Sequence, residues 1–154
     1  MRKIAVIMGS SSDLPVVQPA ADTLKRFEVP HTVHVFSAHR TPDELAKFAK
    51  SAADEGYAAF ICAAGKAAAL PGAVAAYTTL PVIGLPVKSS FLDGLDSLLS
   101  MVQMPSGVPV ATVAVNGAEN AALLAVQILA VNNSELRAKL ENYKAEQREK
   151  VLKG

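Results

Sequence analysis

The stretch HTVHVFSAHRTPDE, residues 31–44, decides the fold because it contains a strand, a loop and a helix start in succession. Residues 31–36 carry β-branched and aromatic side chains, which are typical of a strand. Thr41 has the position of a helix N-cap, with Pro42 at the first helical position and Glu44 three residues beyond the cap, so a capping box is expected. The stretch therefore predicts a strand that leads through a short loop into a helix.

This loop carries His39 and Arg40 side by side. In a parallel α/β sheet such loops gather at the carboxyl ends of the strands, where ligands bind, and a helix N-terminus there favours anions. An imidazole can transfer a proton near neutral pH, and a guanidinium matches the geometry of a phosphate. The alternative is that both residues are ordinary polar loop residues, because one histidine near a helix start is a weak signal.

The same alternation of strand and helix continues on both sides of this stretch. Nearly continuous apolar runs predict four more strands, buried on both faces of a parallel sheet, at residues 3–8, 57–62, 81–87 and 108–115. We therefore expect one domain over residues 1–154: a three-layer α/β protein with a flavodoxin-like, doubly wound parallel sheet of about five strands and an extra C-terminal helix.

Apolar residues at helical spacing predict the helices. The helix that begins at Pro42 should end at Gly56, and leucines from Leu92 onward mark another helix. A helix at about 121–131 is apolar almost all round, which predicts burial on every side, either centrally or against another subunit. The last helix, about 133–152 with its cap at Ser134, should pack on a neighbouring subunit.

Composition limits the classes of partner. The chain has 154 residues, of which 51% are hydrophobic, and its 15 basic and 14 acidic residues give a net charge of +1. No overall field therefore favours nucleic acid or a membrane surface, and a small molecule is the expected partner. A mean hydropathy of +0.27 in so small a chain predicts a homo-oligomer whose contacts cover apolar surface.

Cysteine and histidine usage gives further expectations. Cys62 is the single cysteine and lies in an apolar run, so no internal disulfide can form, and residues 1–4 carry no secretion signal. We therefore expect a cytoplasmic protein. His31 and His34 share one strand with the loop of His39, and no second ligand cluster appears, so these two are expected to be structural and no metal site is predicted.

Three loops follow predicted strands and should meet at one edge of the sheet. Residues 9–13 offer a glycine, hydroxyls and a carboxylate, residues 37–40 offer the histidine and arginine, and residues 64–72 are small apart from Lys66. One pocket built from them suits a phosphorylated, sugar-linked ligand. The alternatives are plain helix capping by Ser12 and Asp13, and a solvated Lys66 beside tightly packed helices.

The motifs also carry a resemblance. The quoted segments are MGSSSD at 8–13, SAHRTP at 37–42, AG at 64–65 with LPG at 70–72, and QMP at 103–105. In this order and spacing, over essentially the whole chain, the sequence resembles the carboxyaminoimidazole ribonucleotide mutase and carboxylase family of purine biosynthesis.

The resemblance implies an activity and an assembly. The reaction moves a carboxylate from the exocyclic nitrogen of aminoimidazole ribonucleotide to ring carbon 4 through trapped carbon dioxide, without metal or organic cofactor. The subunit would be a three-layer α/β protein in an octamer, with its last helix on a neighbour and a functional link to an ATP-dependent synthetase that supplies the substrate.

The resemblance also assigns roles. His39 matches the family's proton-transferring histidine, Ser10 and Asp13 would bind the ribose-phosphate part, and Arg40 would bind the phosphate. The other residues expected to line the substrate site are Ser12, Ser37, Ala38, Ala64, Gly65, Lys66 and Leu70.

Two positions depart from the mutase branch of that family. The branch usually reads Ala-Gly-Gly-Ala-Ala-His-Leu-Pro-Gly, but this chain has Lys66 for the second glycine and Ala69 for the histidine. A basic residue and an alanine at these positions resemble the other branch of the family, which carboxylates aminoimidazole ribonucleotide directly with carbon dioxide. Arg40, in contrast, keeps the mutase form. Our hypothesis is that Lys66 holds the carboxylate or carbon dioxide in place of the missing histidine.

Proteins of other classes also use this fold, among them flavin-binding carriers and receiver switches. A receiver needs an acidic cluster after the first strand and an aspartate after the third, where this chain has serines with one aspartate, and Ala63-Ala64. A flavin carrier would be yellow when purified.

Overall fold

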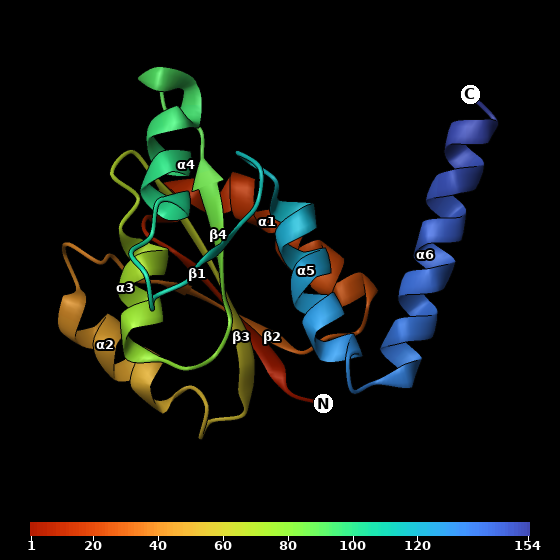
Figure 1. Ribbon diagram of the computed structural model, residues 1–154, viewed down its shortest axis with the longest axis horizontal. Coiled ribbons are helices and arrows are strands. Elements are labelled where there is room, and N and C mark those ends of the chain that lie inside the picture. The colour runs from red at the N-terminus through yellow and green to blue at the C-terminus, as the bar shows by residue number, and fades with distance from the viewer.

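A parallel sheet of five strands forms the centre of the protein, whose residues 1–154 are all described by a computed structural model (Figure 1). The strands are β1 (Lys3–Met8), β2 (His31–Val35), β3 (Tyr57–Gly65), β4 (Val82–Val87) and β5 (Ala111–Thr112). Their order is β2-β1-β3-β4-β5, with every neighbouring pair parallel. This order is the flavodoxin-like one, so the predicted fold class is confirmed.

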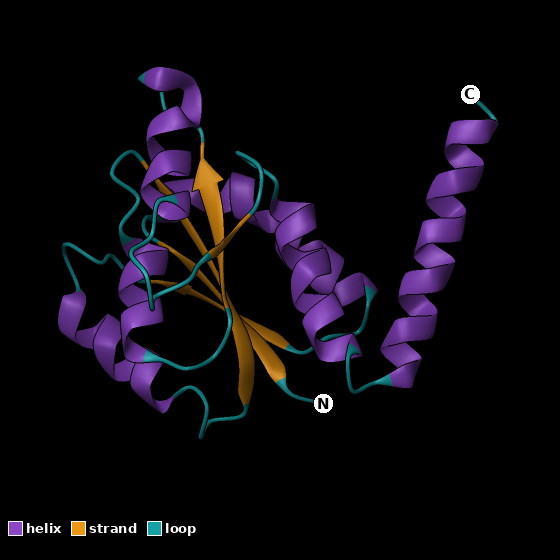
Figure 2. Ribbon diagram, viewed as in Figure 1, coloured by secondary structure: helices purple, strands orange, loops and turns teal.

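Helices cover both faces of the sheet, as Figure 2 shows. They are α1 (Leu14–Arg26), α2 (Pro42–Ser51), α3 (Leu70–Tyr77), α4 (Leu95–Val102), α5 (Ala118–Ala130) and α6 (Ser134–Leu152), with short 3-10 helices η1 (Ser11–Asp13) and η2 (Leu92–Gly94). The side chains of α1 and α5 share one core with one face of the sheet. Those of α2, α3 and α4 share a second core with the other face.

The alternation of side chains along the strands divides the two cores. In β1, Ile4 and Val6 belong to the core under α1 and α5, whereas Ala5 and Ile7 belong to the core under α2 and α3. All four are fully buried. A strand covered on both sides must be apolar at every position, which is why the central strands read as continuous apolar runs.

Two strands differ from the predicted bounds by more than one residue. The third strand continues to Gly65 rather than ending at residue 62, because its last residues still pair with β4. The predicted strand over 108–115 is wrong for most of its length, since only Ala111–Thr112 pairs with the sheet. This segment is at the sheet edge with one neighbouring strand, and Pro109 within it has no N–H to donate.

Several helix predictions also need correction. The helix that begins at Pro42 ends at Ser51, and Gly56 lies in the following turn with φ +84°. The helix expected from Leu92 begins at Leu95, because the backbone of Leu92–Gly94 is left-handed. Helix α5 is not buried on every side by its own chain, because Gln127 is exposed; burial of that side against another subunit stays a prediction.

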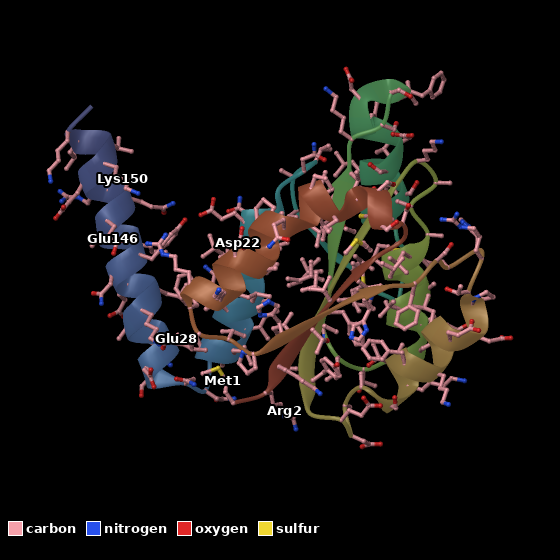
Figure 3. The ribbon with its side chains drawn as sticks, turned by 180° about the vertical axis from the view of Figure 1, so that it is seen from behind. Met1, Arg2, Asp22, Glu28, Glu146 and Lys150 are labelled. Carbon is pink, nitrogen blue, oxygen red and sulfur yellow. The ribbon has the colours of Figure 1, made fainter.

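The C-terminal helix is anchored to the rest of the chain as far as Glu146. Its cap is Asn133, not Ser134, because the Asn133 side chain accepts a hydrogen bond from the N–H of Leu136. Tyr143 is buried and packs edge-on against Phe27 at a centroid distance of 5.7 Å. Figure 3 labels Glu146, whose carboxylate is 2.6 Å from Arg26 of α1, and beyond it the last turns of α6 stand clear of the other helices.

No helix combines the length and the apolar character that crossing a membrane requires.

Candidate active site

A cavity of about 570 Å³ opens at the carboxyl edge of the sheet. The loops that follow β1, β2, β3 and β4 supply its walls. Carboxyl ends of parallel strands share one edge, so residues far apart in sequence meet there. The lining residues are Gly9, Ser10, Ser12, Asp13, Ser37, Ala38, His39, Arg40, Ala64, Gly65, Lys66, Ala67, Ala69, Leu70, Val87, Lys88, Ser89 and Ser90.

Every residue that the sequence placed in the substrate site lines this cavity, so the expectation that three loops form one pocket is confirmed. The sequence analysis missed a fourth wall, formed by Lys88, Ser89 and Ser90. The sequence did offer a signal, because these residues directly follow the fourth strand, just as each of the other three loops directly follows a strand.

The loop of His39 is held together by hydrogen bonds from Ser37 and Thr41. The Ser37 hydroxyl accepts from the backbone N–H of Arg40 at 3.1 Å, and the Thr41 hydroxyl accepts from the N–H of Ser37 at 2.9 Å. The guanidinium of Arg40 also donates to the carbonyl of Gly9 at 3.3 Å, which joins this loop to the loop after β1. His39 and Arg40 are both exposed to solvent at the cavity.

The predicted capping box at α2 is wrong. Thr41 is the N-cap residue, but its side chain makes no cap hydrogen bond. Its hydroxyl instead accepts from the Ser37 N–H and lies 3.2 Å from the Ser37 carbonyl, to which it donates. Thr41 therefore holds the loop of His39 together and does not cap the helix with its side chain.

The loop after β1 presents hydroxyls and one carboxylate. Ser10 caps η1 by accepting from the N–H of Ser12 at 3.3 Å, and the two hydroxyls are 2.9 Å apart. Asp13 is the cap residue of α1 but makes no side-chain cap bond, so the capping alternative does not account for its carboxylate. Partial burial raises the pKa of Asp13 above its usual value, against a smaller lowering by a backbone hydrogen bond at Ser10.

The loop after β3 brings the backbone close to the cavity. Gly65, the last residue of β3, pairs with Val87 of β4, and a Cβ there would lie 3.4 Å from the Val87 carbonyl oxygen, an ordinary van der Waals distance. Lys66 follows with φ +55°, the left-handed conformation that glycine adopts without cost. Lys66 is exposed, whereas Leu70 at the start of α3 is buried.

The charges of the cavity are mostly positive. Arg40, Lys66 and Lys88 carry positive charge, and Asp13 is the one carboxylate among the lining residues. Such a cavity favours a ligand with more than one anionic group. Its hydroxyls and small side chains leave room for a sugar and a flat ring.

The other singled-out residues lie outside the cavity. His31 Nδ1 is 3.0 Å from the Val29 carbonyl, and His34 Nε2 is 2.8 Å from the Thr32 hydroxyl. Burial, with Lys3 nearby, lowers the pKa of His34. No group of three or more histidine, cysteine, aspartate or glutamate side chains is arranged to hold a metal ion.

Cys62 and the QMP segment both lie outside the cavity. Cys62 is fully buried within β3, and burial raises the pKa of its thiol. The QMP segment does not line the cavity. Met104 packs against α3 instead, where a Cβ on Gly72 would lie 3.1 Å from its terminal methyl.

Comparisons with known proteins agree with one another. The model of the family described as AIR carboxylase matches residues 3–150. The chain is 54% identical over 144 residues to an N5-carboxyaminoimidazole ribonucleotide mutase of Pyrococcus abyssi, covering 94% of this chain and 83% of the relative. It is 56% identical over 150 residues to a chloroplastic phosphoribosylaminoimidazole carboxylase of Vigna aconitifolia, but 97% of this chain spans only 27% of that protein.

A solved structure gives the same result. The crystal structure of Treponema denticola PurE aligns with a TM-score of 0.88 and 30% identity, covering 97% of this chain and 94% of the other. Fold, cavity and matched length all point to one group of proteins. The chain belongs to the AIR carboxylase family.

Proposed function

We propose that the protein is a 5-(carboxyamino)imidazole ribonucleotide mutase of purine biosynthesis. It would move the carboxylate from the exocyclic nitrogen of the imidazole to ring carbon 4. The observation that carries the proposal is that His39, Arg40 and the hydroxyl loop after β1 line one cavity. One nucleotide in this cavity could therefore contact a base, a side chain that binds its phosphate and side chains that bind its ribose.

His39 would act as both acid and base. As the bond between nitrogen and the carboxyl carbon breaks, the imidazolium gives a proton to the departing nitrogen, and carbon dioxide remains in the cavity. Carbon 4 then attacks carbon dioxide and returns its proton to the imidazole, so the isomerisation balances without net proton release. The exposure of His39 at the cavity supports this role because the ring is accessible to a ligand.

The other ligand roles follow from the chemistry of the walls. Arg40 would bind the phosphate, since its guanidinium can pair with two phosphate oxygens. Ser10, Ser12 and Asp13 would hold the ribose and phosphate, and Ser37 and Ala38 would lie beside them. The small residues Ala64 and Gly65, with Leu70, would let the imidazole ring lie against backbone. No cofactor is needed for these steps.

The close alternative is direct carboxylation of aminoimidazole ribonucleotide by carbon dioxide. Lys66 and Ala69 favour it, whereas Arg40 favours the proposal. Sequence identity does not separate the two reactions, because the chain is 56% identical to the carboxylase of Vigna aconitifolia and 54% and 51% identical to the mutases of Pyrococcus abyssi and Escherichia coli. The matched length favours the proposal, since the chain covers 83% and 90% of those mutases but 27% of that carboxylase.

One assay separates the two reactions. Purified protein receives either the carbamate nucleotide, or aminoimidazole ribonucleotide with bicarbonate, and formation of the carbon 4 carboxylate is followed. We expect turnover of the carbamate nucleotide at low concentration and a colourless protein. Preference for aminoimidazole ribonucleotide with bicarbonate would establish the carboxylase, and a yellow protein inactive with both would indicate a flavin carrier.

Lys66 would hold the migrating carboxylate or the trapped carbon dioxide. Its position on the cavity wall next to Gly65 supports this hypothesis. Lys66→Ala should lower turnover without unfolding the protein, because the side chain is exposed. Unchanged turnover would end the hypothesis.

We further infer a homo-oligomer, specifically an octamer in the cytoplasm. Large apolar side chains at and before α4 support an interface, because Phe91, Leu92, Leu95, Leu99 and Val102 are 46–72% exposed. The end of α6 supports packing on a neighbour in the same way, with Val151 81% exposed. Light scattering should give about eight times the 16.1 kDa chain mass.

A functional link to an ATP-dependent synthetase is part of the proposal. The carbamate nucleotide must be made from aminoimidazole ribonucleotide and bicarbonate, a condensation that requires activation. A coupled assay with such a synthetase should form the carbon 4 carboxylate only when both enzymes are present.

A further inference from the structure

Lys88 is the positive charge of the cavity that neither the sequence motifs nor the proposed mechanism uses. It follows β4 directly and lines the cavity with Ser89 and Ser90. Its backbone is fixed from two sides. The N–H of Lys88 donates to the side-chain oxygen of Asn116 at 2.9 Å, and the carbonyl of the preceding Val87 accepts from the buried Ser97 hydroxyl, also at 2.9 Å.

The ammonium group of Lys88 is available to a ligand. Its single ion pair is with Asp93, at 3.6 Å, and the two side chains are 59% and 83% exposed. A pair this exposed contributes little, because water screens it and side-chain entropy opposes it. A ligand anion inside the cavity can therefore displace Asp93.

The strand order separates Lys88 from Arg40. Their loops follow β4 and β2, three strand intervals apart in the order β2-β1-β3-β4. At about 4.8 Å for each interval, the two loop roots are about 14 Å apart. Arg40 reaches back toward β1, where it donates to the Gly9 carbonyl, so its charge lies about two strand intervals, or about 10 Å, from the root of the Lys88 loop.

This separation suits a ligand with an anion at each end. If the phosphate lies at Arg40, the ribose and then the imidazole extend toward β3 and β4. The remaining anion of the carboxylated nucleotide is its carboxylate, which would then come near Lys88. Aminoimidazole ribonucleotide has no anion at that end.

We propose that Lys88 joins Lys66, which the proposed function places on the same group, in binding the carboxylate of the carboxylated imidazole, and that Lys88 thereby makes the site prefer carboxylated over uncarboxylated nucleotide. The inference rests on the proposed function, because it needs that nucleotide as ligand. Asp93 competes with the carboxylate for the same ammonium group. Lys88 is thus a specificity-determining residue rather than an acid or base.

The test measures binding of two nucleotides by titration calorimetry: the carbon 4 carboxylated product and aminoimidazole ribonucleotide. Lys88→Met should weaken binding of the carboxylated nucleotide about tenfold, the usual effect of losing one charge-assisted contact, and change the other Kd by less than about twofold. Lys88→Arg should retain the preference for the carboxylated nucleotide, because it keeps the positive charge. Lys47→Met, on the exposed side of α2 and outside the cavity, is the matched control and should change neither Kd.

A second variant tests the competition. Asp93→Asn should tighten binding of the carboxylated nucleotide by about twofold to threefold and leave the other nucleotide unaffected. Equal weakening of both nucleotides by Lys88→Met, or weakening of neither, would overturn the inference while the wild-type assay still supports the enzyme. Failure of the wild-type protein to bind either nucleotide would overturn the proposed function and this inference together.

Discussion

Lys66 combines a strained backbone with a position on the cavity wall. Its φ of +55° is in the left-handed region, where a side chain costs on the order of 1 kcal/mol or more and glycine costs little. The family resemblance also places a glycine here. A lysine retained in this conformation is therefore more easily explained by a task at the cavity than by stability.

Lys66→Gly should separate these two effects. The free energy of unfolding of the variant should be about 1 kcal/mol higher, because glycine relieves the strain of the left-handed backbone. Its turnover should fall about tenfold, because the cation is lost. Chemical denaturation and steady-state kinetics measure the two quantities. A variant that is more stable and fully active would show that Lys66 has no part in the reaction.

The proposed role of His39 depends on proton transfer and not on shape. His39→Asn keeps a polar side chain of similar size, so nucleotide binding should change little while kcat falls about 10²-fold to 10⁴-fold. Single-turnover kinetics and calorimetry with the carboxylated nucleotide give the two values. Loss of binding with kcat unchanged would instead make His39 a binding residue.

At the level of elements, the loop between β2 and α2 is closed by Thr41. Its hydroxyl bonds to both backbone groups of Ser37, four residues earlier, whereas Glu44 is exposed and makes no capping box. The geometry of His39 thus depends on a hydroxyl that the sequence assigned to the helix end.

Thr41→Ala and Glu44→Ala form a matched pair. Thr41→Ala should lower the free energy of unfolding by about 1 kcal/mol and also lower turnover, because the loop loses the bonds that hold it. Glu44→Ala should change the free energy of unfolding by less than about 0.5 kcal/mol, as usual at an exposed surface position. Urea denaturation measures both, and a larger loss for Glu44→Ala would restore the capping box.

At the level of the whole molecule, α4 turns its leucines outward. Leu95 and Leu99 are 51% and 46% exposed, while the fully buried residues of this helix are Ser97 and Met101. An amphipathic helix whose leucines face solvent indicates a partner surface.

Leu95→Glu together with Leu99→Glu should therefore dissociate the oligomer. Two charges on one face oppose burial against a neighbour, whereas the chain's own core hardly contacts these residues. Light scattering should show a mass well below that of the wild type, and circular dichroism should show retained helix. An unchanged mass would place the subunit interface elsewhere.

Sequence alone determined the fold class and most of the site. Continuous apolar strands such as residues 3–8 can be buried only between two helix layers, and that requirement leads to the parallel sheet. The loops of Ser10 to Asp13, Ser37 to Arg40 and Ala64 to Leu70 follow directly from the strand ends. These are local patterns, and local patterns are readable in a sequence.

Only the tertiary structure decided what depends on contacts between distant segments. The Arg40 guanidinium bonds to the carbonyl of Gly9, which follows another strand and lies 31 positions earlier in the chain. Lys88 enters the site because β4 lies beside β3, and β5 is short because its edge position gives it one partner. The physical reason is the same in each case: the competing contact comes from residues far away in the chain, which spacing along the sequence does not reveal.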